Sequence, residues 1–188
     1  ASADLEDESE KGAVQVADPF LKRVLSEANM KVLDFLLDRG IKFGFKDLGA
    51  GGIACVTSEL AAHGGLGIEV NLDMVPVSIP DLPSEIIACA ETQERYGLAV
   101  PERVAGEVLK IYNEEYELPR LFPHARGSVV GVFSEDPYYR VLHGGAEVAN
   151  APIGCITEGI IYEREWKQSP VPVIEPDSRP CNPSEDLK

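Results

Sequence analysis

A single carboxylate, Asp47, stands directly before a stretch with almost no side chains, DLGAGG at residues 47–52. The preceding residues are typical of a short strand that ends at Asp47, and the apolar spacing of Ile53 and Leu60 predicts a helix after the loop. Free N–H groups at a helix N-terminus beside a carboxylate suit an anion together with Mg²⁺. Asp47 is therefore a candidate metal ligand. The alternative is a tight turn in which Asp47 hydrogen-bonds the local backbone.

Known phosphate-binding fingerprints do not explain this loop. The stretch lacks the Lys-Ser/Thr pair of a P-loop and does not fit the spacing G-x-G-x-x-G. A ligand at this loop would therefore be bound by the carboxylate and by the bare backbone that follows it.

A second polar cluster, ETQER at residues 91–95, lies between an apolar helix-like run and the strand-like run RYGLAV. Glu91, Thr92 and Gln93 at the edge of a strand could bind a polar ligand, because the Gln93 amide both donates and accepts. The alternative is an ordinary solvated connection, since polar loops are common.

Gln15 is the third candidate. It is centred in the strand-like run Val14-Gln15-Val16, so it faces either solvent or a cleft. Asp18 and Pro19 follow as a predicted helix N-cap and first helical residue.

Composition narrows the class of protein. The 188 residues are 44% hydrophobic, enough for one domain with a core, and the formal net charge is −15. This charge disfavours nucleic acid or an anionic membrane as a partner, because both need a basic face. A phosphorylated metabolite remains compatible, because Mg²⁺ can bridge carboxylates and phosphate oxygens.

No apolar run is long enough to cross a bilayer, and the acidic N-terminus is unlike a signal peptide, so we expect a cytoplasmic protein. The four cysteines form no C-x-x-C pair, which argues against zinc, and we expect reduced thiols. Cys55 and Cys89 lie among small apolar residues and are interpreted as core cysteines.

Helical and strand-like runs alternate along the chain, and YYRVLHGGAEVAN predicts a late β-hairpin. This order predicts an α/β (α+β) layered sandwich with a mixed β-sheet and packed helices. We expect an acidic lead-in at residues 1–12, the domain at residues 13–166, and a proline-rich linker or tail at residues 167–188.

Four motifs in order, VQVADPF, KDLGAGGIACVTSEL, LDMVP and ETQERYGLAV, carry a family resemblance. The chain resembles the ligase subunit of phosphoribosylformylglycinamidine synthase, an enzyme of purine synthesis. Within that subunit it is similar to the C-terminal domain of the first of two aminoimidazole-ribonucleotide-synthetase-like halves. The resemblance covers about residues 1 to 165.

The resemblance implies an ATP-dependent amidation. Formylglycinamide ribonucleotide is activated at its amide oxygen by phosphate from ATP, and ammonia made from glutamine by a glutaminase subunit or domain displaces that phosphate. It also implies that Asp47 is a Mg²⁺ ligand and that Gln15, Glu91, Thr92 and Gln93 contact the ribonucleotide. Ala17, Thr92 and Tyr96 replace the Gly, Ser and Met that are usual in the family.

The resemblance places the catalytic histidine, most ATP contacts and most Mg²⁺ ligands in an N-terminal ATP-binding domain and a second half outside this chain. We therefore assign no catalytic residue here and expect the isolated domain to be inactive. Two alternatives stay open. One is a sister ATP-dependent enzyme of the aminoimidazole ribonucleotide synthetase, selenophosphate synthetase or hydrogenase maturation type. The other is a non-catalytic scaffold half.

Overall fold

The structure is a computed structural model that describes residues 18–159 and 162–168. Gln15, the predicted acidic lead-in and all but the first two residues of the predicted tail lie outside the described residues. The domain boundaries predicted from the sequence therefore stay predictions.

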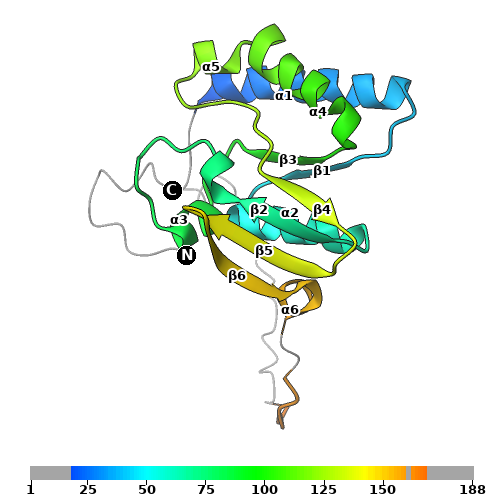
Figure 1. Ribbon diagram of the computed structural model, residues 1–188, viewed down its shortest axis with the longest axis vertical. Coiled ribbons are helices and arrows are strands. Elements are labelled where there is room, and N and C mark those ends of the chain that lie inside the picture. The colour runs from blue at the N-terminus through cyan, green and yellow to red at the C-terminus, as the bar shows by residue number, and fades with distance from the viewer. Residues whose placement is uncertain (1–17, 160–161, 169–188) are drawn as a thin grey trace, which may run out of the picture.

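Helices and strands stack in layers (Figure 1). Helices α1 and α4 cover one face of a two-stranded ribbon, and α2 lies between that ribbon and a larger sheet. The helical elements are α1 (Pro19–Asp38), α2 (Gly52–His63), η1 (Leu72–Met74), α3 (Ser84–Cys89), α4 (Glu102–Lys110), η2 (Ile111–Glu115), α5 (Leu118–Leu121) and α6 (Ile153–Thr157). The strands are β1 (Gly44–Asp47), β2 (Gly67–Asn71), β3 (Tyr96–Ala99), β4 (Gly131–Ser134), β5 (Tyr138–His143) and β6 (Ala146–Pro152).

The sheet topology confirms the predicted mixed α/β fold. The larger sheet has four strands in the order β4-β2-β5-β6; β2 and β5 run parallel, whereas the β2–β4 and β5–β6 pairs are antiparallel. Strands β1 and β3 form a separate antiparallel ribbon. The predicted hairpin is confirmed, with Gly144 and Gly145 at its turn, both in the left-handed region.

Local sequence explains where α1 begins and ends. The Asp18 side chain accepts a hydrogen bond from the backbone N–H of Leu21 at 2.9 Å, and Pro19 occupies the first helical position. At the other end Gly40 has a φ of +61°, a conformation that glycine adopts without steric cost. The predicted N-cap and first helical residue are confirmed.

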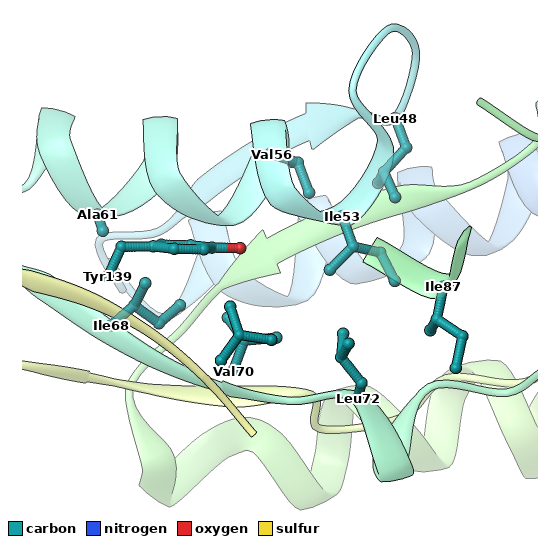
Figure 2. Close-up of a cluster of buried hydrophobic side chains, with 10 residues drawn as sticks. Leu48, Ile53, Val56, Ala61, Ile68, Val70, Leu72, Ile87 and Tyr139 are labelled. Atoms are coloured by element: carbon teal, nitrogen blue, oxygen red, sulfur yellow. The ribbon is translucent and has the colours of Figure 1, made fainter. Parts of the chain in front are cut away.

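Two apolar cores lie on opposite sides of the ribbon. In the first, residues of α2 face the sheet, and Figure 2 shows the Tyr139 ring lying between Ala61 and Ile68. The second joins α1 to α4 and η2, with Val32 and Leu36 fully buried. Each fully buried Leu or Val contributes roughly 1.5–3 kcal/mol to folding, so both cores are needed to hold the layers together.

Helix α2 packs closely against the ribbon because two ribbon positions have no side chain. A Cβ atom on Gly44 would lie 2.8 Å from Leu60 Cδ2, and one on Gly97 would lie 2.8 Å from Val56 Cγ2. These glycines let the helix approach the backbone of β1 and β3. The approach sets the N-terminus of α2 at the end of β1, where Asp47 stands.

One expectation needs correction, because the sequence predicted Cys55 and Cys89 to be core cysteines. Cys89 is exposed, because it ends the short helix α3, whose buried residue is Ile87; Cys55 is half-buried. Among the described cysteines none is therefore fully buried.

Candidate functional site

The two polar motifs singled out in the sequence meet at one end of the ribbon. Strands β1 and β3 pair with Asp47 opposite Tyr96. One residue further, the backbone N–H of Leu48 donates to the carbonyl oxygen of Arg95 at 2.9 Å. The glycine-rich loop and the segment 91–95 are therefore joined by a main-chain hydrogen bond, although more than forty residues separate Asp47 from Glu91 in the chain.

Asp47 is the outermost residue of β1, and its side chain is exposed. Within the described residues no hydrogen bond or ion pair involves its carboxylate, so the tight-turn alternative, in which the carboxylate caps local backbone, is not what this structure contains. Helix α2 begins five residues later with Gly51 as N-cap and no side-chain cap. The Gly52 N–H donates to the Gly49 carbonyl oxygen at 3.1 Å, so in the first turn the N–H groups of Ile53 and Ala54 are left for another acceptor.

A carboxylate oxygen of this kind fits Mg²⁺, which commonly takes one or two protein carboxylates together with water and phosphate oxygens. In the described ranges no three His, Cys, Asp or Glu residues gather closely enough to hold a metal by themselves. Asp47 would therefore be one ligand among several, the others coming from water, substrate or further protein.

Gly52 and Gly49 have different surroundings in the loop. Gly52 has a φ of +55°, and a Cβ there would lie 2.4 Å from the carbonyl oxygen of Ala90. Gly52 is thus required where the loop packs against the end of α3. At Gly49 a Cβ would meet nothing within 4 Å, so the loop is open at that position.

The segment 91–95 is half-buried throughout and is braced by its own side chains. The Gln93 amide donates from Nε2 to the Glu91 carbonyl oxygen at 3.2 Å. The Arg95 guanidinium donates from Nε to the Thr92 carbonyl at 2.7 Å and from Nη2 to the Ala90 carbonyl. The segment is therefore an internally hydrogen-bonded loop of partly buried residues.

Sequence reasoning missed Lys22, which brings a positive charge to the same place from α1. Its Nζ lies 3.2 Å from Glu94 Oε2 and 3.4 Å from the Tyr96 hydroxyl, and contact with Glu94 and then with Tyr96 raises the pKa of Lys22. The buried Glu94 Oε2 receives no well-aligned hydrogen bond, and the Glu94 backbone has a φ of +60°. No spacing in the sequence links Lys22 to a residue more than seventy positions away.

Other polar contacts lie close by in the fold. Lys46 pairs with Glu59, and Cys55 Sγ donates to the other Glu59 carboxylate oxygen at 3.2 Å. A groove of about 560 Å³ between α1 and α4 is lined by residues such as Asp34, Arg39 and Glu107. None of its lining residues belongs to the two polar motifs.

Comparison with known proteins decides the family. Residues 1–121, more than half of the chain, match the family described as "AIR synthase related protein, C-terminal domain". The chain belongs to this family. Over 174 residues it is 44% identical to the phosphoribosylformylglycinamidine synthase subunit PurL of Methanothrix thermoacetophila, covering 93% of this chain and 22% of that protein. The PurL of Sulfurisphaera tokodaii is 35% identical over 180 residues, with 96% and 23% covered.

Solved structures of family members agree with the fold. Thermotoga maritima PurL complexed with FGAR matches with a TM-score of 0.67 and 31% identity over 86% of this chain and 25% of that chain. The structure of PurLQS from the same organism matches with a TM-score of 0.62 and 30% identity over 87% and 28%. The resemblance inferred from the four motifs is confirmed. The chain spans about a quarter of the length of these relatives.

None of the helices in residues 18–159 and 162–168 combines the length and the apolar character that a membrane span needs.

Proposed function

We propose that this chain is the part of an ATP-dependent ligase that holds formylglycinamide ribonucleotide (FGAR) during its amidation. The observation that carries the proposal is the hydrogen bond from Leu48 to Arg95, because it brings the Asp47 loop against the segment Glu91-Thr92-Gln93. Belonging to the family of the PurL ligases supports it, as do the structures of Thermotoga maritima PurL complexed with FGAR and with ATP.

In the proposed reaction the amide oxygen of FGAR takes the γ-phosphoryl group of ATP and ADP leaves. Ammonia then adds to the carbon atom that bears this oxygen, and phosphate departs with the former amide oxygen. The products are formylglycinamidine ribonucleotide, ADP and phosphate. Ammonia comes from glutamine through a glutaminase subunit or domain, and the ATP contacts come mostly from other domains of the ligase.

The residues of this chain bind and orient the substrate. The Thr92 hydroxyl and the Gln93 amide offer donors and acceptors to the ribonucleotide, with the Glu91 carboxylate beside them and Gln15 as a further contact. Asp47 would hold Mg²⁺, which supplies charge neutralisation to phosphate oxygens when bound. Only part of the site is contributed here, so the isolated chain should bind without turning over.

The test is ADP release by the complete ligase that contains this chain, with Mg-ATP and ammonium, in the presence and absence of FGAR. ADP release that depends on FGAR supports the proposal. Release that is independent of FGAR, or no release, favours a sister enzyme of the same superfamily or a non-catalytic scaffold half.

The substitution Gln93→Ala separates the proposal from a non-catalytic scaffold half. We expect weaker FGAR binding by the complete ligase, because the substituted side chain can no longer donate or accept a hydrogen bond. In a scaffold half the affinity for FGAR would hardly change, and this result would favour the scaffold.

A further inference from the structure

The segment 91–95 has an internal brace that the proposed substrate contacts do not include. It joins the end of α3 at Cys89 to the start of β3 at Tyr96, and none of its residues lies in a helix or strand. Such a segment has no ladder of main-chain hydrogen bonds to fix its shape. Its conformation therefore depends on side-chain hydrogen bonds as well as on the main-chain bond from the Leu48 N–H to the Arg95 carbonyl oxygen.

Arg95 supplies most of that bracing. Its Nε donates to the Thr92 carbonyl at 2.7 Å, and its Nη2 donates to the Ala90 carbonyl. The two carbonyls lie three and five residues earlier in the chain, one on each side of Glu91. A planar guanidinium can hold two such acceptors at fixed angles, which a lysine ammonium on a flexible stem does not reproduce.

The backbone of Arg95 is fixed as well, because its carbonyl oxygen accepts the Leu48 N–H at 2.9 Å. The neighbouring residue, Glu94, is tied to α1 by its ion pair with Lys22. Glu94 and Arg95 are thus attached to α1 and to the ribbon. Through its hydrogen bonds to Ala90 and Thr92, the Arg95 side chain can therefore hold residues 91–93 in place relative to the ribbon.

The geometry points to Arg95 as a positioning residue of the substrate site: by holding the carbonyls of Ala90 and Thr92, it presets Glu91, Thr92 and Gln93 for the ribonucleotide. This inference rests on the proposed function. Arg95 acts through the conformation of the loop, because its guanidinium donates to the main-chain carbonyls of Ala90 and Thr92.

The expected consequence is kinetic. A loop that samples many conformations binds the ribonucleotide less tightly, because ordering it costs free energy that the preset loop does not lose. The substitution Arg95→Ala in the complete ligase should raise the KM for FGAR by about tenfold or more while changing kcat and the KM for ATP much less. Arg95→Lys should give an intermediate KM, since it keeps the charge and the stem without the two-way donor geometry.

Arg103→Ala is the matched control. Arg103 is an exposed arginine of α4, so its loss removes one positive charge without touching the segment. Its KM for FGAR should equal that of the unsubstituted ligase. Amide hydrogen exchange gives a second readout, and in Arg95→Ala the amides of residues 91–93 should exchange faster than in the control while those of α2 are unchanged.

Any of the following results would overturn the inference. One is a KM for FGAR in Arg95→Ala equal to that of Arg103→Ala. Another is an equal increase in the KM values for FGAR and for ATP, which would indicate general damage to the fold. If Arg95→Ala does not fold, Arg95→Lys decides, and a KM for FGAR unchanged from the unsubstituted ligase overturns the inference.

If the unsubstituted ligase releases no ADP in response to FGAR, the proposed function fails and the inference fails with it. FGAR-dependent release combined with an unaffected Arg95→Ala overturns the inference alone.

Discussion

The backbone N–H of Leu48 donates to the carbonyl oxygen of Arg95 at 2.9 Å, one residue beyond the pairing of Asp47 with Tyr96. This bond extends the β1–β3 ribbon into the two loops that carry the candidate site. Displacing one loop from the other would break this main-chain hydrogen bond. Asp47 and Gln93 therefore lie on two loops that are hydrogen-bonded to each other.

The close approach of the glycine loop to α3 predicts a large penalty for a small substitution. Gly52→Ala should lower the free energy of unfolding by about 1–3 kcal/mol, because the new Cβ meets the Ala90 carbonyl and the φ of +55° disfavours any side chain. Urea unfolding of the 188-residue chain, followed by circular dichroism, measures it.

Gly49→Ala is the control in the same loop. Its Cβ would meet nothing within 4 Å, so the free energy of unfolding should change by less than about 1 kcal/mol. Equal losses in the two variants would show that the loop requires glycine for some reason other than the contact with Ala90.

The exposed position of Asp47 predicts that its charge matters for activity and not for folding. In the complete ligase, Asp47→Asn should lower Mg²⁺-dependent turnover by about tenfold or more, because the neutral amide is a poor ligand for this hard cation. The free energy of unfolding should stay within about 0.5 kcal/mol, because no described residue bonds to this carboxylate. Initial rates over a Mg²⁺ titration, together with thermal unfolding, test both statements.

Asp38→Asn provides the comparison, since Asp38 is an exposed carboxylate at the last residue of α1. Its Mg²⁺ titration should match that of the unsubstituted ligase. An Asp47→Asn variant that unfolds would identify Asp47 as a structural residue and would refute the metal assignment.

Asp73, from the LDMVP motif, fastens the turn of the β5–β6 hairpin. Both of its carboxylate oxygens accept from the Gly144 N–H, at 3.0 and 3.1 Å, and His143 Nε2 lies 3.7 Å from Oδ1. Asp73→Ala should loosen this turn by about 1 kcal/mol, so the Gly144 amide should exchange several-fold faster. Amides of α2 serve as the internal reference, and unchanged exchange at Gly144 would mean that the hairpin turn is stable without Asp73.

Two buried tyrosines predict a loss of stability at alkaline pH. Burial raises the pKa of Tyr112, whose hydroxyl donates to Asn29 Oδ1 at 2.7 Å, and burial is also the main cause that raises the pKa of Tyr139, which lies 2.9 Å from Thr57 Oγ1. The neutral form is favoured in the folded state, so this contribution is complete below the unfolded pKa of about 10 and is lost as pH rises through the folded pKa.

Above about pH 10 the free energy of unfolding should therefore fall by up to about 1.4 kcal/mol per pH unit for each tyrosine. Denaturant unfolding at a series of pH values measures the slope. Tyr112→Phe and Tyr139→Phe should each flatten it, and a slope that survives in the double variant would have to come from other groups.

The sequence alone predicted the α/β class, the capped helix from Pro19, the strand that ends at Asp47 and the hairpin, because caps, glycine stops and periodicity are local signals. It also indicated the family, through four motifs in order. The roles of Asp47, Glu91, Thr92 and Gln93 in metal and substrate binding stay predictions, and Gln15 lies outside the described residues.

Only the tertiary structure decided which distant residues meet. No local signal separates β1 and β3 from the larger sheet, places Lys22 beside Glu94, or assigns Gly52 to a contact with Ala90. These contacts arise when α2 packs between two layers, since strand pairing and side-chain packing depend on residues far apart in the chain. For the same reason the Arg95 brace could be seen only after the loop had been folded, whereas the chemistry of its neighbours could be inferred from their side chains.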